Sequence, residues 1–244
     1  MTTKLSTRAS LAGDEVVTSD MRSKKRSYMA RFDLEGMKHE DLGVPDRSGT
    51  GQRLLGAAIN LFASRGYNAC SMREVAKAVN IGAPAIYNYY ASKTDILVAS
   101  LDFVLSTFYR AILKNPLPQN PEGALFAILR RHVLFGISNR TFARAADVLL
   151  NKELMVRELP TSHTYRYSAA MDEYRKILEE LIREVVGGEP VIGFALQAFL
   201  VHEMVDRAGE WYEPEGPLNP ADVADQCCEA VARLLGLPAK TASR

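Results

Sequence analysis

Side chains suited to reading nucleic acid gather in one short stretch, VNIGAPAIYNYYASK, which runs from Val79 to Lys93. The amide of Asn88 can pair with an adenine edge in the major groove, and the small Ala83 and Ala85 can meet thymine methyl groups at close range. Tyrosine hydroxyls and lysine ammonium groups donate to phosphate oxygens without sequence preference. The stretch therefore predicts contact with double-stranded DNA.

Catalytic or metal chemistry has no comparable cluster. The four histidines have no HExxH or other ligand spacing, and no GxSxG, Walker A or GxGxxG pattern is present. They are His39, His132, His163 and His202. Three cysteines without CxxC spacing are expected to be buried thiols. These are Cys70, Cys227 and Cys228. The sequence thus predicts a protein that is not an enzyme and needs neither a metal nor a cofactor.

The charge of the chain is unevenly distributed. Residues 49–93 carry five lysines and arginines against one acidic residue, whereas residues 94–244 carry 16 basic and 20 acidic residues. A local excess of positive charge attracts polyanions. The charge distribution therefore favours DNA as the partner of residues 49–93.

Three short helices are expected to position this stretch. Apolar residues at helical spacing from Leu54 to Phe62 predict the first helix, which Gly66 would end. Ser71 and Glu74 form the pattern of a capping box at the start of a second helix. Asn80 tolerates the left-handed conformation that reverses the chain. Together these signals predict a helix-turn-helix.

Within the third helix, Ile86 and Tyr90 lie four residues apart and are expected to pack inward. The remaining side chains would face outward, although the spacing alone equally allows the tyrosines to be packing residues. The candidate DNA contacts are Thr50, Ser71, Arg73, Gly82, Ala83, Pro84, Ala85, Tyr87, Asn88, Tyr89 and Lys93.

The rest of the chain reads as longer helices without a convincing strand, so the predicted fold class is all-α. Helices are expected over 94–114, 120–135, 142–151, 160–186, 190–209 and 219–235. The predicted domains are a flexible extension over 1–48, a DNA-binding domain over 49–97, an effector-binding and dimerisation domain over 98–237 and a tail over 238–244.

The basic cluster Lys24–Arg26 could be an arm that contacts DNA, but a solvated extension is the favoured interpretation, with Met21 or Met37 as alternative starts. Since no run reaches the length of a membrane span, we expect a cytoplasmic protein without a membrane partner.

The segment LLGAAINLFASRGYNACSMREVAKAVNIGAPAIYNYYASKTDIL resembles the DNA-binding domain of TetR-type bacterial transcriptional regulators. The resemblance covers Gly49 to about Leu97, and it departs from the usual family residues at Val79-Asn80, Gly82 and Pro84. It implies a homodimeric repressor whose recognition helices enter successive major grooves about 34–36 Å apart. A C-terminal domain would release the operator when an effector binds.

In that family the last two helices normally form the dimer bundle. Their apolar stripes could instead be core within one chain, but dimer contact is the favoured interpretation. The candidate dimer residues are Phe194, Ala198, Val201, Val205, Val223, Cys227, Val231 and Leu234.

The C-terminal segment EWYEPEGPLNPADVADQCCEAVARLLG resembles a TetR subgroup that includes acyl-CoA-responsive regulators of sterol and fatty-acid breakdown. We expect a mostly apolar effector pocket with a few fixed polar groups. Its candidate residues are Phe126, Arg130, Phe135, Arg140, Phe142, Arg144, Tyr165 and Met171. The alternative for these residues is ordinary core or solvated surface. Two other functions stay open: a regulator of an efflux or detoxification operon that senses a hydrophobic drug-like molecule, and an all-α carrier or enzyme without DNA binding.

Overall fold

The computed structural model describes residues 49–113, 116–188, 190 and 192–238, and every regular element in these ranges is helical. The predicted all-α class is confirmed. The predicted extension over 1–48, with its basic cluster Lys24–Arg26, lies outside the described residues, as does the tail after Pro238. The elements are α2 (Thr50–Arg65), α3 (Met72–Ala78), η1 (Ala83–Asn88), α4 (Lys93–Leu113), α5 (Pro121–Ser138), α6 (Arg140–Leu149), α7 (Lys152–Glu158), α8 (Thr161–Val186), α9 (Phe194–Asp206), α10 (Ala208–Trp211) and α11 (Pro220–Leu234).

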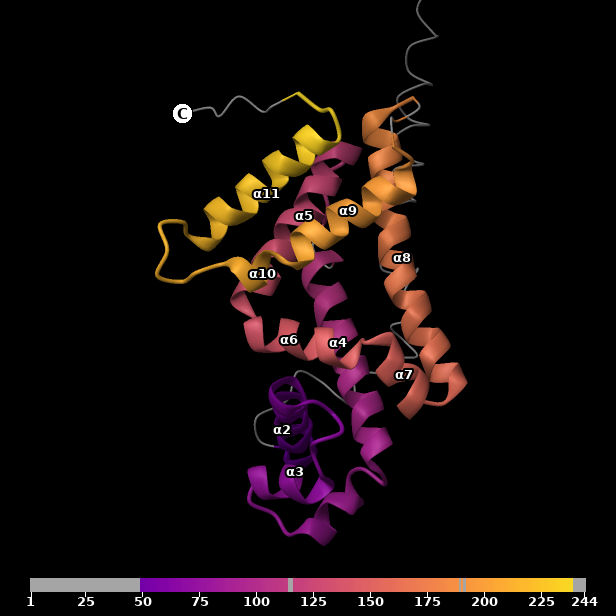
Figure 1. Ribbon diagram of the computed structural model, residues 1–244, viewed down its shortest axis with the longest axis vertical. Helices are drawn as coiled ribbons and strands as arrows, with labels where there is room; N and C mark the ends of the chain where they lie inside the picture. The colour runs from indigo at the N-terminus through magenta and orange to yellow at the C-terminus, as the bar shows by residue number, and fades with distance from the viewer. Residues whose placement is uncertain (1–48, 114–115, 189, 191, 239–244) are drawn as a thin grey trace, which may run out of the picture.

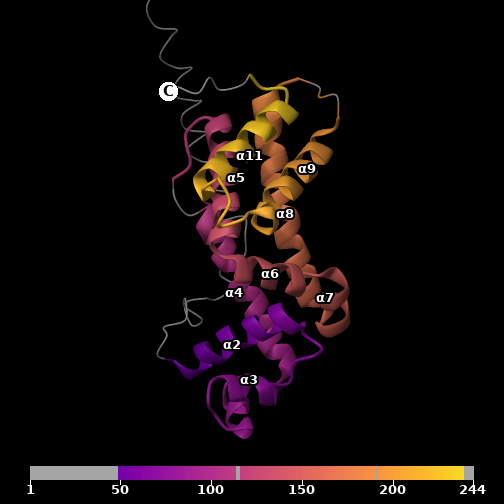
Figure 2. The ribbon, with the colours of Figure 1, turned by 60° about the vertical axis from the view of Figure 1, so that its left-hand side comes forward.

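The helices form a small group at one end of the molecule and a larger bundle at the other (Figure 1). The small group contains α2, α3 and η1, and α4 runs from it into the bundle. In the bundle α5 packs against α4, α8 and α11, while α9 packs against α8. Helix α6 lies between α2 and the bundle in both views and packs on α2 (Figure 2). Thus α4 and α6 both connect the small group to the bundle.

Local signals place the ends of several helices where the sequence predicts them. The side chain of Asn120 accepts a hydrogen bond from the N–H of Gly123 at the start of α5, where Pro121 fits the first turn. Asn219 forms a capping box at the start of α11. Gly187 has a φ of 60° and ends α8, because a positive φ is easy only for glycine.

Two predicted elements differ from the structure. The predicted helix over 142–151 corresponds to α6, and a further helix that was not predicted, α7, follows it, because the side chain of Asn151 caps a new helix instead of only ending the old one. The predicted helix over 190–209 begins at Phe194 and gives way to the short α10 after Asp206. In both cases the overall course of the chain is unchanged.

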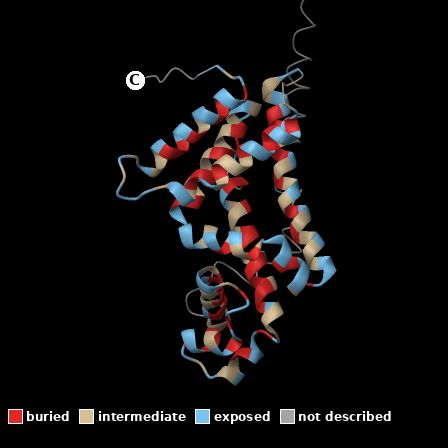
Figure 3. Ribbon diagram, in the orientation of Figure 1, coloured by how far each residue is buried: buried red, intermediate tan, exposed pale blue. Residues whose placement is uncertain are grey.

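Buried residues, red in Figure 3, run along the helices of the bundle. Its core contains three fully or almost fully buried tyrosines. The hydroxyl of Tyr109 donates to the carbonyl of Ala170 at 3.0 Å, and the hydroxyl of Tyr167 donates to Asp102 at 2.9 Å. The third, Tyr174, contacts a histidine described below. Each hydroxyl has a partner because an unpaired buried polar group is costly.

Helix α4 is long and apolar enough to cross a membrane, although the sequence analysis expected no such segment. It is the single helix of this kind among the described residues, and 61% of its apolar window is buried inside the protein. A core helix that packs on both α5 and α6 accounts for that apolar surface.

Candidate DNA-binding surface and effector cavities

Helix α2 supplies the core of the small group. Leu54, Ala58 and Phe62 are fully buried, and the ring of Phe62 meets that of Tyr67 edge to face at 5.2 Å between centroids. Gly66 ends the helix with a φ of 80°, as predicted. The apolar face of α2 therefore provides the platform on which α3 packs.

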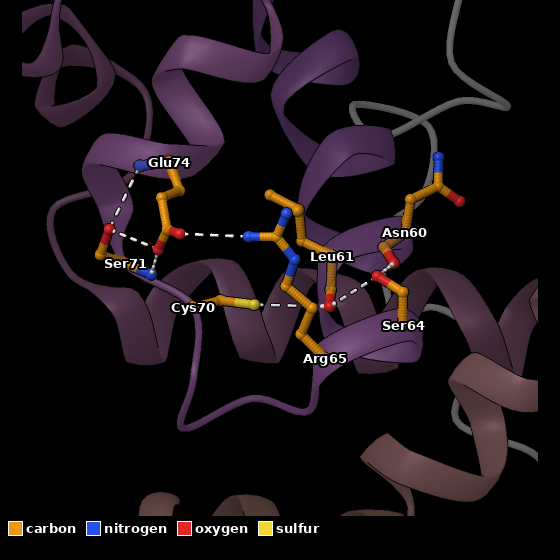
Figure 4. Close-up of polar contacts among 7 residues, drawn as sticks. All are labelled: Asn60, Leu61, Ser64, Arg65, Cys70, Ser71 and Glu74. Carbon is orange, nitrogen blue, oxygen red and sulfur yellow. Dashed lines mark hydrogen bonds and ion pairs between the residues drawn. The ribbon is translucent and has the colours of Figure 1, made fainter.

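The start of α3 is fixed by the predicted capping box (Figure 4). The hydroxyl of Ser71 lies 2.8 Å from a carboxylate oxygen of Glu74, and the backbone N–H of Ser71 donates to the same oxygen at 2.8 Å. Arg65 pairs with the other oxygen of Glu74 at 3.2 Å. Ser71 is a predicted phosphate contact, but here its hydroxyl and N–H are both occupied by Glu74. A phosphate would have to compete with that carboxylate.

The turn after α3 has the conformation that the sequence predicts. Asn80 has a φ of 60°, the one positive φ outside glycine in the described part of the chain. The guanidinium of Arg53, on α2, donates to the carbonyl of Val79 at the end of α3. This bond ties the turn to α2, although Arg53 itself stays exposed.

The η1 segment is a six-residue 3-10 helix where the sequence analysis expected an ordinary third helix. Ile86 is fully buried, and the hydroxyl of Tyr90 donates to the carbonyl of Gly51 at 3.1 Å, so both predicted anchors face inward. Burial raises the pKa of Tyr90 to about 12. The two anchors hold η1 against the start of α2.

The other side of η1 faces solvent. Tyr87 and Tyr89 are 55% and 49% exposed, and Asn88 between them is exposed as well. Gly82 and Pro84 are also exposed, while Ala83 and Ala85 are half-buried. A run of exposed aromatic and amide side chains on a fixed backbone is available to another molecule.

Three further predicted DNA contacts flank this surface. Arg73 is exposed on α3, and Thr50 is half-buried at the first residue of α2. The ammonium of Lys93 lies 4.1 Å from the centroid of the Tyr67 ring, which is a cation–π contact. Lys93 is therefore held beside η1 at the start of α4.

The candidate dimer residues need a correction. Seven of the eight are buried within the chain and cannot meet another subunit, so the intrachain-core alternative applies to them. They are Phe194, Ala198, Val201, Val205, Val223, Cys227 and Val231. Leu234 is 37% exposed, and a different face of α9 exposes Leu196, Phe199 and Leu200. The candidate dimer residues on α9 pack inward because the long α8 and α5 cover them.

The candidate effector residues divide among three cavities. Four of them, Phe135, Arg140, Phe142 and Arg144, line a cavity of about 280 Å³, which we call cavity A. Met171 lines a second cavity of about 290 Å³, cavity B.

The remaining candidates lie elsewhere. Phe126 and Arg130 line a third cavity of about 400 Å³ between α5 and α11, where Arg130 pairs with Asp225 at 2.7 Å. Tyr165 lines none of these three cavities and is 76% exposed on α8. Four of the eight candidate effector residues thus line one cavity, and the other four lie outside it.

Sequence reasoning missed the polar groups inside the bundle. Nδ1 of His132 lies 3.0 Å from the Tyr174 hydroxyl, and Nε2 lies 3.3 Å from a carboxylate oxygen of Asp206. Burial acts to raise the pKa of Asp206, but the hydrogen bond from His132 and the nearby positive charges outweigh it and lower the pKa. The available signal was a polar residue inside an apolar stripe, as at His132 in α5.

Helix α6 belongs both to a cavity wall and to the support of the small group. Phe142 and Asp147 line cavity A, whereas Ala145 and Leu149 of the same helix are fully buried. Since α6 packs on α2, a molecule that displaces α6 would also disturb the seat of the DNA-binding surface.

Comparison with known proteins gives two family matches. Residues 54–99 match the bacterial regulatory proteins of the tetR family, and residues 118–235 match the tetracyclin repressor-like C-terminal domain. The chain is 28% identical over 173 residues to the HTH-type transcriptional repressor KstR of Rhodococcus jostii (strain RHA1), a match that covers 70% of this chain and 76% of KstR. It is 35% identical over 85 residues to YuxN of Bacillus subtilis (strain 168), an uncharacterised regulator; that match covers 33% of this chain and only 29% of YuxN.

Solved structures share the fold. AibR in complex with isovaleryl coenzyme A and operator DNA superposes with a TM-score of 0.64 at 22% identity, covering 77% of this chain and 99% of AibR. The ketosteroid regulator KstR2 of Mycobacterium tuberculosis gives a TM-score of 0.62 at 20% identity, covering 78% of this chain and 94% of KstR2.

Proposed function

Since the chain belongs to the TetR family, and is therefore a DNA-binding transcriptional regulator and not an enzyme, we propose that it acts as a repressor. The proposed repressor is a cytoplasmic homodimer that a hydrophobic effector releases from its operator. The observation that carries this proposal is the η1 surface. Its two anchors, Ile86 and Tyr90, are buried, and its outward side chains Tyr87, Asn88 and Tyr89 are free to meet DNA. The tyrosines would position the segment on phosphate, and Asn88 would read a base edge.

The homodimer is supported by the exposed apolar face of α9. Leu196, Phe199 and Leu200 are 49%, 42% and 37% exposed, and Leu234 of α11 adds a further apolar side chain. Contiguous exposed apolar side chains favour burial in an interface. We propose that this face replaces the buried stripe predicted from the sequence.

Release of the operator would follow from the position of α6. A ligand in cavity A contacts α6, and α6 packs on α2 of the DNA-binding group. An effector that fits the cavity only after α6 has moved would favour the arrangement that does not fit the operator.

For the effector we propose an acyl-CoA thioester. Arg140 and Arg144 lie one turn apart on α6 at cavity A and pair with no acidic side chain in the described part of the chain. They could bind coenzyme A phosphates, because guanidinium groups match phosphate geometry, while Phe135 and Phe142 receive the acyl group. The AibR complex with isovaleryl coenzyme A supports this choice. A drug-like effector of an efflux operon is the alternative, since the aromatic wall would accept it too.

A gel-shift assay tests the proposal with the DNA that flanks the gene for this protein, at low salt, where phosphate contacts are strongest. We expect Asn88→Ala to weaken operator binding by roughly fivefold to 150-fold in each half-site, which corresponds to the loss of one base contact worth about 1–3 kcal/mol. The matched control is Asn68→Ala, an exposed asparagine in the α2–α3 loop.

Two results would count against the proposal. Equal effects of the two asparagine variants on operator binding would remove Asn88 from the reading surface. Titration with acyl-CoA thioesters that leaves operator affinity unchanged would overturn the choice of effector.

A further inference from the structure

Cavities A and B share one wall. Phe108 of α4, Ala146 and Asp147 of α6, and Asp206 of α9 line both of them. We call these four residues the shared wall. Phe108 is the centre of an aromatic cluster, with its ring centroid 4.7 Å from that of His132 and 5.7 Å from that of Tyr174. A ligand longer than either cavity would have to pass this wall.

The polar groups at the shared wall are arranged in one direction. A carboxylate can only accept, so with a neutral imidazole Nε2–H of His132 donates to Asp206 and Nδ1 accepts the hydroxyl proton of Tyr174. The tyrosine oxygen keeps its lone pairs, and the second oxygen of Asp206 makes no hydrogen bond within the described residues. The chain of bonds therefore ends in acceptors.

Two neighbouring groups add to this. Asp147 is exposed and makes no hydrogen bond or ion pair with any residue that the structure describes, and partial desolvation together with Asp206 raises its pKa. Nδ1 of His202, a residue that lines cavity B, lies 3.5 Å from a carboxylate oxygen of Glu203, so a neutral His202 that donates there keeps Nε2 as an acceptor. The cationic groups around the cavities are Arg140, Arg144, Arg175 and Arg207. Of these, Arg175 is paired with Asp172 and Arg207 with Glu210.

We infer that the effector places a hydrogen-bond donor, a hydroxyl or an ammonium group on an otherwise apolar body, against Asp147 and Asp206 at the shared wall. This inference rests on the proposed function, because it assigns the effector to cavities A and B. A plain hydrocarbon that filled both cavities would remove water from Asp147 and from the second oxygen of Asp206 and leave these oxygens without donors, which is costly. A donor at that point restores the lost hydrogen bonds, so the wall selects for it.

Isothermal titration calorimetry of the full chain without DNA tests this selection. Octanoyl-CoA is compared with its ω-hydroxy and ω-amino derivatives, and octanoic acid is compared with octanol and octylamine. We expect at least one derivative to bind roughly tenfold to a hundredfold more tightly than octanoyl-CoA, as a hydrogen bond to a charged group contributes. Asp147→Ala should abolish most of that preference, whereas Glu215→Ala, in the exposed loop before α11, should keep it.

The outcomes separate this inference from the acyl-CoA proposal. If octanoyl-CoA binds as tightly as both derivatives, the donor requirement is wrong and the acyl-CoA proposal stands. If no thioester binds while octanol or octylamine binds more tightly than octanoic acid, the donor requirement stands and the acyl-CoA proposal falls. A preference for ω-hydroxy over ω-amino identifies a hydroxyl donor, and the reverse identifies an ammonium. Absence of binding in every arm, or a preference that survives Asp147→Ala, overturns the inference.

Discussion

Lys93 offers the sharpest test of the DNA-binding surface, because its ammonium has two possible roles. It lies 4.1 Å from the centroid of the Tyr67 ring, and it is also the first residue of α4, directly after the η1 surface. An ammonium has three donors, so it can rest on a ring and still donate to a phosphate oxygen. We predict that Lys93→Gln removes one phosphate contact in each subunit.

The magnitude follows from counterion release. Each neutralised phosphate contributes about 0.9 to the slope of log affinity against log salt, so the loss from two subunits is about 1.8. Between about 50 and about 200 mM salt, both dimers lose affinity for the operator. The fold-loss of the Lys93→Gln dimer should be about one twelfth of the fold-loss of the unmodified dimer. Loss of the cation–π contact should also lower the free energy of unfolding by about 0.5–1 kcal/mol per subunit.

Fluorescence anisotropy with labelled operator at several salt concentrations measures the slope, and thermal melting measures the stability. Lys152→Gln, at the start of α7, is the control for removal of one lysine charge from another helix. Tyr67→Phe keeps the ring and should leave the slope unchanged. If Lys93→Gln lowers the melting temperature but has the slope of the unmodified protein, the phosphate role is refuted and Lys93 acts only by packing.

Two further predictions concern stability and assembly. Ser71→Ala should lower the free energy of unfolding by about 1 kcal/mol through loss of the N-cap, measured by urea denaturation. Hydrogen bonds from Ser71 lower the pKa of Glu74, so the stabilisation from this pair should be present above the unfolded pKa of a glutamate and be lost as the pH falls through the lowered pKa. A Ser71→Ala effect that stays constant across that pH range would contradict the capping box. Leu200→Glu should shift the protein from dimer to monomer in sedimentation velocity. The control Glu215→Lys, in the exposed loop before α11, should leave the dimer intact. If the Leu200→Glu protein remains a dimer, the exposed face of α9 is not the interface.

The features that could be predicted from the sequence are local ones. The cap at Ser71, the left-handed Asn80 and the inward Ile86 each depend on residues within a few positions, and all three appear in the structure. The inward packing of the candidate dimer stripe on α9 could not be predicted, because it depends on how α8 and α5 pack against it. Likewise, 74 residues separate His132 from Asp206, so no spacing rule connects them.

The shared wall also bears on how one sensor domain could serve two cavities. Phe108 belongs to α4, which begins directly after the η1 surface, and Asp147 belongs to α6, which packs on α2. Under the proposed function, a ligand in either cavity would contact the same two helices, and both lead to the DNA-binding group. Allosteric coupling of about 1–3 kcal/mol changes operator affinity about fivefold to 150-fold. One or two hydrogen bonds to the shared wall have this magnitude, so the contact that selects the effector would be strong enough to set the response.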